Sequence, residues 1–246
     1  MDNAGNLYGT GGSAYELSPG PKGWKLIILH EFKGKHGDGS DPYAGLILDP
    51  AGNLYGTTAG GGSSRCGGGC GTAYQLTPSS GGKWKETILH RFNASNDGAF
   101  PGLGALVLDG AGNLYGTTSV GGATGYGTVF RLAPSGNGHW TETILYDIPG
   151  GASGAEPGAG VVMDRAGKLF GTTTAGGDPN CGCGVIFELA PSSTNGKWTY
   201  TVLHRFTGYD GAQPDANLIL DDKGNLYGTT ATGGAGGYGV AFEITP

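Results

Sequence analysis

The chain contains 246 residues, carries a formal net charge of −6 and has only 14% charged residues, against about 25% in an average soluble protein. Its lysines and arginines do not form the clusters that phosphate binding requires, so no nucleic acid is expected as a main partner. No apolar run approaches the ~18 residues of a transmembrane helix, so no membrane span is expected. Glycine accounts for 54 residues without a three-residue period, which predicts turns and loops rather than a fibre.

One short segment occurs five times and organises the sequence. The copies begin at residue 6 and then recur at intervals of 47 to 60 residues between their aromatic positions: Asn6–Thr10, Asn53–Thr58, Asn113–Thr118, Lys168–Thr173 and Asn225–Thr230. Repetition at this period is typical of solenoids and propellers. The glycine inside each copy weakens a strand, so its recurrence predicts that another group approaches the backbone closely there.

Each repeat predicts four short strands in a fixed order, seen most clearly at 45–49, 53–58, 71–76 and 84–92. The first strand is apolar and ends in an acid, and an Ala-Gly or Lys-Gly turn joins it to the second. The third strand alternates apolar and polar residues and stops at a proline. The fourth begins with tryptophan, and a link with Gly and Pro leads to the next repeat.

Four short antiparallel strands per repeat of about 50 residues predict a blade of a β-propeller. We therefore expect an all-β fold, a single five-bladed propeller, with a β-solenoid as the second possibility. The expected repeats cover residues 1–34, 35–94, 95–149, 150–208 and 209–246.

The terminal repeats are incomplete. The chain starts at the second strand of a repeat and ends after the third, which predicts three, four, four, four and three strands. Three explanations remain open: the outer blades have three strands, the chain is a portion of a longer protein, or a neighbouring chain supplies the missing strands.

The repeated motifs resemble a known family. The Leu-Tyr-Gly-Thr-Thr copies, the strand Gly-Thr-Val-Phe-Arg-Leu at 127–132 and the Asp-Gly-x-x-Pro-x-x-x-Leu links together resemble the bacterial choice-of-anchor tandem repeat GloVer-containing proteins over essentially the whole chain. This resemblance implies an exported protein carrying a separate anchor, and it implies no particular reaction. The chain shows neither an export signal nor an anchor, which favours a mature or excised portion.

Four cysteines lie in equivalent loops of two repeats, as Cys66 with Cys70 and Cys181 with Cys183. The second and fourth repeats are not neighbours in a five-membered ring, so we expect each pair to form its own disulfide in an oxidising compartment. No metal is expected at these cysteines, because each loop offers two ligands and no nearby histidine.

Three histidines, His30, His90 and His204, share one repeat position, which Tyr146 occupies in the fourth repeat. Their recurrence predicts a structural role in which each bonds the same backbone group. The aspartates of the links, Asp38, Asp97 and Asp210, are expected to make turns, with calcium binding as the alternative.

Residues that break the repeat are the better candidates for function, because a catalytic centre is asymmetric. The candidate acids and bases of a glycosidase or lyase are His36, Asp41, Asp147 and Glu156. The candidate ligand-binding residues are the loop tyrosines, which could stack on sugar rings, and two charged loop residues: Tyr126, Tyr209, Tyr238, Arg65 and Asp178. The sequence favours the simpler interpretation that these acids are solvated loop residues of an acidic protein.

The sequence favours an exported, extracellular or cell-surface binding or scaffold module without a cofactor, and carbohydrate is its most plausible ligand. No set of nucleophile, base and orienting group is apparent. Two alternatives remain: a polysaccharide hydrolase or lyase with acids from different blades, and a structural subunit that self-associates by strand complementation.

Overall fold

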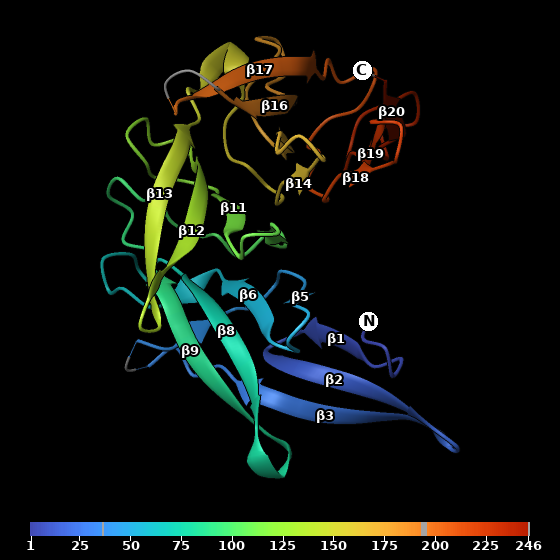
Figure 1. The fold of residues 1–246 in the computed structure, drawn as a ribbon. Coiled ribbons are helices and arrows are strands. Elements are labelled where there is room, and N and C mark those ends of the chain that lie inside the picture. Colours follow the sequence, from blue (N-terminus) through green and yellow to red (C-terminus); the bar gives the residue numbers. More distant parts are fainter. Residues whose placement is uncertain (36, 193–195, 246) are drawn as a thin grey trace.

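Five antiparallel sheets follow one another around a common centre, so the fold is a five-bladed β-propeller, as the sequence predicts (Figure 1). The computed structural model describes residues 1–35, 37–192 and 196–245. The first and last blades flank the same side of the ring, where both chain ends lie (Figure 1). Within the described ranges, no helix has the length and apolar character to cross a membrane.

The blades contain three, four, four, four and three strands, which confirms the predicted count. Blade 1 has β1 (Leu7–Thr10), β2 (Ser13–Gly20) and β3 (Gly23–Glu31); blade 2 has β5 (Ile47–Leu48), β6 (Leu54–Thr58), β8 (Thr72–Ser79) and β9 (Lys83–Arg91); blade 3 has β10 (Val107–Leu108), β11 (Leu114–Thr118), β12 (Thr128–Gly136) and β13 (His139–Asp147); blade 4 has β14 (Val162–Met163), β15 (Leu169–Thr173), β16 (Val185–Pro191) and β17 (Trp198–Arg205); blade 5 has β18 (Ile219–Leu220), β19 (Leu226–Thr229) and β20 (Ala241–Ile244).

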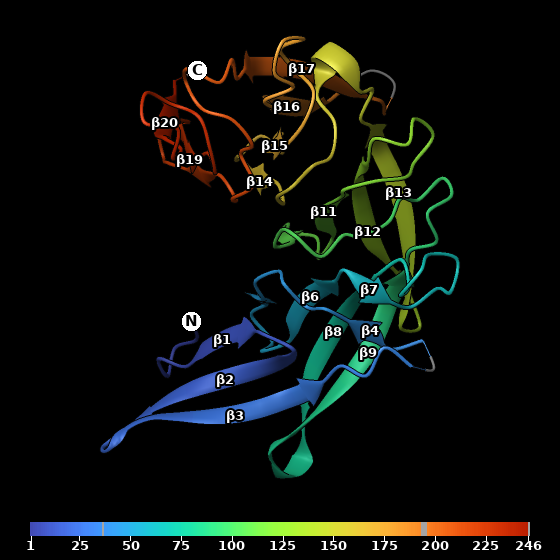
Figure 2. The ribbon, with the colours of Figure 1, turned by 180° about the vertical axis from the view of Figure 1, so that it is seen from behind.

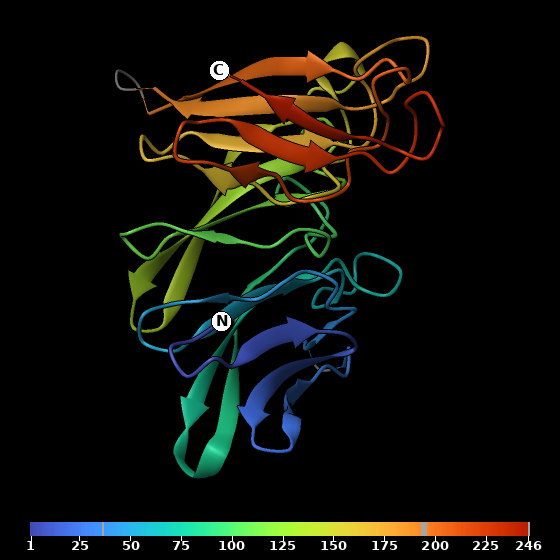
Figure 3. The same ribbon diagram turned by 90° about the vertical axis from the view of Figure 1, so that its right-hand side faces the viewer.

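A small additional sheet, which the repeat pattern does not predict, lies beside blade 2 (Figure 2). It pairs β4 (Gly39–Ser40) with β7 (Gly60–Gly61) and so joins the link that precedes the blade to the loop that follows β6. Two short 3-10 turns, η1 (Ser80–Gly82) and η2 (Gly151–Ser153), complete the regular structure. In side view, hairpin tips project at one end of the ring and the long loops between second and third strands at the other (Figure 3).

The hairpin that opens each repeat is closed by an aspartate. In blade 2, Asp49 Oδ1 accepts hydrogen bonds from the backbone N–H of Ala51 and Asn53 at 2.9 and 2.8 Å. Its Oδ2 accepts from Asn53 Nδ2 at 2.8 Å and from Tyr55 Oη at 3.0 Å. Blade 3 repeats this network around Asp109 with Asn113 and Tyr115. The recurring acid, Asn and Tyr are therefore one hydrogen-bonded unit.

The recurring glycine makes room for an aromatic ring, which confirms the predicted close approach. Gly116 pairs across the sheet with Phe130, and a Cβ added to it would lie 2.7 Å from Phe130 Cζ and 2.8 Å from Leu106 Cδ2. Gly56 stands in the same relation to Tyr74 and Leu46. A larger residue at either position would displace a ring that is fully buried.

The threonines that end the recurring segment connect the blades. Thr57 Oγ1 donates to the carbonyl of Pro101 at 3.0 Å, and Thr117 Oγ1 donates to that of Ala159 at 2.6 Å. Each bond runs from the second strand of one blade to the link that precedes the first strand of the next. The following threonine bonds within its own blade, as Thr118 does with Thr128 at 2.9 Å. The segment therefore stabilises its own blade and also holds the next blade against it.

The hydrophobic core is divided among the blade interfaces rather than gathered in one place. Tyr55 and Phe92 of blade 2 pack with Phe130 and Leu132 of blade 3, and equivalent clusters lie at the other three interfaces between successive blades. Stability is consequently a sum of blade and nearest-neighbour terms, as in other repeat proteins.

Gly116→Ala should lower the free energy of unfolding by about 1–3 kcal/mol, because the added methyl group would overlap Phe130 and Leu106 in a packed core. Urea denaturation followed by circular dichroism measures the change. Gly110→Ala is the matched control, since nothing lies within 4 Å of a Cβ there. Equal stability of the two variants would contradict the close-approach explanation of the repeated glycine.

Asp109→Asn should lower the free energy of unfolding by roughly 1–2 kcal/mol at neutral pH. The new side-chain amide would face the Asn113 amide, which donates to Asp109 in the wild type. Burial raises the pKa of Asp109, but hydrogen bonds from Asn113, Tyr115 and the backbone outweigh it and hold the pKa below 3.8. A lowered folded-state pKa stabilises the fold above the unfolded value and loses that contribution as pH falls through the folded value. The difference in the free energy of unfolding between wild type and variant should therefore become smaller below pH 3.8. A difference that stayed constant in acid would refute the proposed role of the Asp109 carboxylate.

Candidate functional site

The links between blades meet the long loops at one end of the propeller, and one residue in each link has an unusual backbone. The residue before each link proline has a positive φ of 56 to 58°, a conformation that non-glycine residues rarely adopt: Asp41, Phe100, Glu156 and Gln213. Hydrogen bonds hold this conformation. The Glu156 N–H donates to the Tyr126 carbonyl, and the Glu156 carbonyl accepts from the Thr174 N–H, both at 3.0 Å. The backbone is therefore uniform while the side chain varies from link to link.

Glu156, a predicted candidate acid, lines a pocket of about 370 Å³ between blades. Asp215, on the next link, lines the same pocket, together with Ser119, Thr174 and Leu103. The structure thus brings together two carboxylates, two hydroxyl-bearing side chains and an apolar side chain. The Thr174 hydroxyl is already engaged, since it donates to the Glu156 carbonyl at 2.9 Å.

Asp215 was not among the residues predicted from the sequence, although the repeat pattern distinguishes it. It follows the link proline, where the other links have Tyr43, Gly102 and Gly158. Comparing the residue after the proline, as well as the one before it, would have marked Asp215 as a departure from the repeat.

The other candidate acids lie elsewhere. Asp41 accepts hydrogen bonds from Ser40 at 3.0 Å and from Tyr43 at 3.5 Å and does not line the Glu156 pocket. Asp147 Oδ1 accepts from the Ala123 N–H at 2.7 Å and so ties the last strand of blade 3 to the long loop of that blade. His36 lies outside the described residues.

The three loop tyrosines differ in exposure. Tyr209 and Tyr238 are 91% and 94% exposed, whereas Tyr126 is 46% exposed and packs against Gly150. Tyr209 and Tyr238 belong to adjoining loops of the last blade, because the Gly234 N–H donates to the Gly208 carbonyl at 2.9 Å. Two bare aromatic rings therefore stand on loops that hydrogen bonds hold together.

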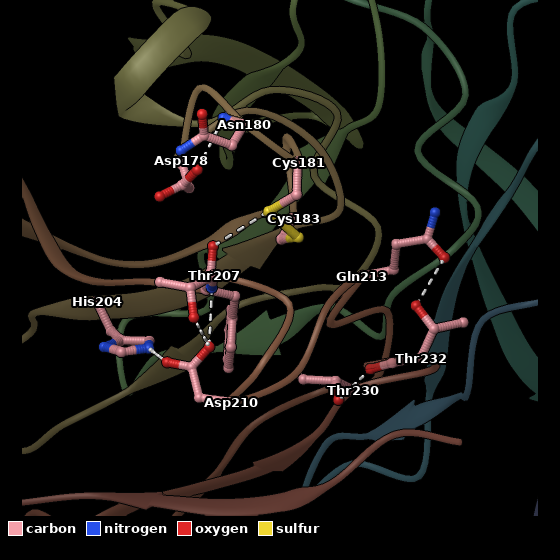
Figure 4. The surroundings of a disulfide bond; sticks show 11 residues. Asp178, Asn180, Cys181, Cys183, His204, Thr207, Asp210, Gln213, Thr230 and Thr232 are labelled. Carbon is pink, nitrogen blue, oxygen red and sulfur yellow. Dashed lines mark hydrogen bonds and ion pairs between the residues drawn. A yellow bond between two sulfur atoms is a disulfide. The ribbon is translucent and has the colours of Figure 1, made fainter. Parts of the chain in front are cut away.

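Arg65 and Asp178 stabilise the cysteine-containing loops. Arg65 Nη1 donates to Ser95 Oγ at 2.9 Å and connects its loop to the following link. Asp178 Oδ1 accepts from the Asn180 N–H at 2.8 Å beside the second cysteine pair (Figure 4).

Both cysteine pairs are joined as the sequence predicts, with Cys66 bonded to Cys70 and Cys181 to Cys183. Cys70 and Cys183 are buried, and the Cys70 carbonyl accepts from the N–H of Phe100 at 2.9 Å. The Cys183 carbonyl accepts from the N–H of Gln213 at the same distance. Each disulfide therefore anchors the loop that holds the strained residue of the next link.

The repeated histidines contact carboxylates, so the prediction of a common backbone partner was wrong. His30 Nε2 lies 3.5 Å from Asp38 and 3.6 Å from Glu86 of the next blade, and His90 Nε2 lies 3.1 Å from Asp97 and 3.8 Å from Glu142. His204 contacts Asp210 at 2.8 Å (Figure 4).

These clusters have perturbed protonation. Burial, together with the Asp38 carboxylate, raises the pKa of Glu86 to about 7, and burial with Asp97 raises that of Glu142 to about 8. Burial lowers the pKa of His90 although the hydrogen bond to Asp97 opposes it. The His-Asp-Glu sets are the groups among the described residues whose geometry could hold a metal ion.

One known structure supports the fold. The structure is similar to a point mutant of the NanB sialidase from Streptococcus pneumoniae, with 11% identity and a TM-score of 0.55 over 95% of this chain and 36% of the sialidase chain. It is also similar to an exo-1,5-alpha-L-arabinanase from a bovine ruminal metagenomic library, with 11% identity and a TM-score of 0.48 over 99% of this chain and 89% of that one. The chain thus spans little more than a third of the sialidase.

A comparison with curated proteins found no match. The family model of the Gloeobacter/Verrucomicrobia repeat matches the chain twice, over residues 1–194 and 67–246, and these matches together include all five copies of the recurring segment. They confirm the resemblance that the repeated motifs indicated, and the chain belongs to the Gloeobacter/Verrucomicrobia repeat family.

Proposed function

We propose that this propeller is a non-catalytic module that binds extracellular carbohydrate through the loops of its last blade. The observation that carries the proposal is the pair of exposed rings, Tyr209 and Tyr238, on hydrogen-bonded neighbouring loops. Flat amphipathic rings stack on the apolar faces of sugars while their hydroxyl groups bond at the edge. Exposed aromatic side chains on adjoining loops are typical of a binding surface.

The surroundings of the two tyrosines suit a neutral polar ligand. Their loops are rich in glycine and threonine, and the chain as a whole has a low charge content. The two loop disulfides support an oxidising, extracellular location. The fold likeness to a sialidase is compatible with this proposal, although fold alone does not give function.

A second candidate function is self-association through the outer faces of the first and last blades. Trp84 and Trp140 each pack edge-on against a tyrosine of the preceding blade, at centroid distances of 6.3 and 6.2 Å. The equivalent Trp24 of blade 1 is 57% exposed, and Leu26 and Ile28 on the same strand are also exposed. Their natural complement is the opposite face of blade 5, so the proposed occupant is blade 5 of a second copy.

Tyr209→Ala and Tyr238→Ala should each weaken adsorption to a bound polysaccharide about tenfold or more, because each would remove a stacking surface. The measurement incubates the protein with a panel of soluble and insoluble polysaccharides and reads protein depletion and released reducing ends from the same tubes. Tyr43→Ala, an exposed tyrosine on a distant link, is the control and should bind normally.

Release of reducing ends would overturn the non-catalytic proposal and favour the hydrolase or lyase alternative. In that case Glu156→Gln and Asp215→Asn, which keep the shape of the pocket, should abolish release. If both tyrosine variants were still depleted from solution by the polysaccharide, the proposed binding surface would be rejected.

Self-association predicts a light-scattering mass well above 24.7 kDa that Trp24→Ser returns to the mass of one chain. The loss follows from removing the largest exposed apolar group of the proposed contact. A wild-type protein that stays at 24.7 kDa at high concentration would exclude this candidate function.

A further inference from the structure

We propose that the two clusters His30-Asp38-Glu86 and His90-Asp97-Glu142 each bind a divalent transition-metal cation of the zinc type. We call them the first and second inter-blade sites. In each, the histidine comes from the last strand of one blade, the aspartate from the following link and the glutamate from the last strand of the next blade. A bound cation would therefore connect neighbouring blades. This inference is independent of the proposed carbohydrate binding.

The distances suit ligands of a shared ion. In the first site, His30 Nε2 lies 3.5 Å from Asp38 Oδ1 and 3.6 Å from Glu86 Oε1, which is long for hydrogen bonds. Two ligands held about 2.0–2.2 Å from a tetrahedral Zn²⁺ are about 3.4 Å apart. All ligand atoms of each site lie within 4.8 Å of one another. Only a modest adjustment separates these positions from coordination.

Each site contains a buried carboxylate oxygen without a partner. Glu86 Oε1 and Glu142 Oε1 accept no hydrogen bond within the described part of the chain, and their side chains are only 15% and 12% exposed. A buried carboxylate oxygen without a hydrogen bond is costly. A cation would supply the missing partner and neutralise two adjacent acids.

The surrounding structure already orients the ligands. The rings of His30 and His90 pack edge-on against Phe32 and Phe92, at centroid distances of 4.6 and 4.7 Å. The second oxygen of Asp38 accepts from the Lys33 N–H at 2.8 Å, which leaves Oδ1 directed to the site. Such outer contacts are typical of metal sites, where they fix the direction of each ligand.

The third blade interface provides an internal comparison. There the positions of histidine, aspartate and glutamate hold Tyr146, Ser153 and Tyr200. The two tyrosine rings stack at 4.7 Å with an angle of 2° between their planes, and Tyr200 Oη donates to the Ser153 carbonyl at 2.7 Å. All three ligands are replaced together. Because they are replaced as a set, we infer that the three residues act as a set.

The fourth interface has two of the three ligands. His204 and Asp210 form a direct contact of 2.8 Å (Figure 4). Among the described residues blade 5 has three strands, so no fourth strand presents a carboxylate there. This pair serves as a natural two-ligand control.

The chemistry of the ligands indicates the class of cation. One imidazole nitrogen and two carboxylates suit Zn²⁺ and its neighbours in the first transition series, and three protein ligands leave a coordination position for water. Ca²⁺ prefers six to eight oxygen ligands, which these sites do not offer.

The test is equilibrium dialysis of the untagged, EDTA-treated protein against Zn²⁺, followed by metal analysis and thermal melting. Wild type should bind two Zn²⁺ per chain and melt at a higher temperature when Zn²⁺ is present, since the ion binds only the folded state. Glu86→Gln and Glu142→Gln should each retain one Zn²⁺, and the double variant should retain none. Substitution with Co²⁺ should give a visible spectrum that reports tetrahedral coordination.

Glutamine removes the charge without leaving a hole, so the variants should fold, and melting in EDTA checks this directly. His204→Gln should leave the stoichiometry at two, because the fourth interface lacks the third ligand. Absence of stoichiometric Zn²⁺ binding, or binding that the double variant keeps, would overturn the proposal. Preferential binding of Ca²⁺ would overturn the assigned class of cation.

Discussion

The close approach of the second-strand glycine and the third-strand aromatic ring is the constraint on which the rest of this propeller depends. Gly116 and Phe130 show it most plainly, because no side chain other than hydrogen fits between the ring and the strand. The buried ring then forms the centre of the core shared with the preceding blade. Since this core lies between blades, one close contact determines both the sheet and its packing on its neighbour.

The blades are joined by contacts that repeat, and this leaves individual side chains free to vary. Thr57 and Thr117 bond the start of the next blade through backbone carbonyls, which any residue can provide. The residue before each link proline is held by its own backbone groups as well. Asp41 and Glu156 can therefore occupy equivalent strained positions without any demand on their carboxylates. Functional differences accumulate in the links and loops for this reason.

The inter-blade sites show that the residues at one interface are replaced together. The first two interfaces bury acids around a histidine, while the third uses two stacked tyrosines in the same place. Both solutions fill the same volume between the last strands of adjacent blades. They differ in charge, because the first leaves two acids that need a proton or a cation, and the second needs neither.

The sequence by itself determined the five blades, the strand count and the cysteine pairs, because each depends on local spacing: an Ala-Gly turn, a mid-strand glycine, two cysteines in one loop. It also marked Glu156 as a departure from the repeat and the loop tyrosines as candidate sugar-binding residues. Only the tertiary structure decided which of these residues meet. Asp215 joins Glu156, and Glu86 joins His30, through contacts between residues of successive repeats, and no spacing within one repeat encodes such a contact. The exposure of Tyr209 and Tyr238, and the partial burial of His30 and His90, likewise follow from how neighbouring blades cover one another.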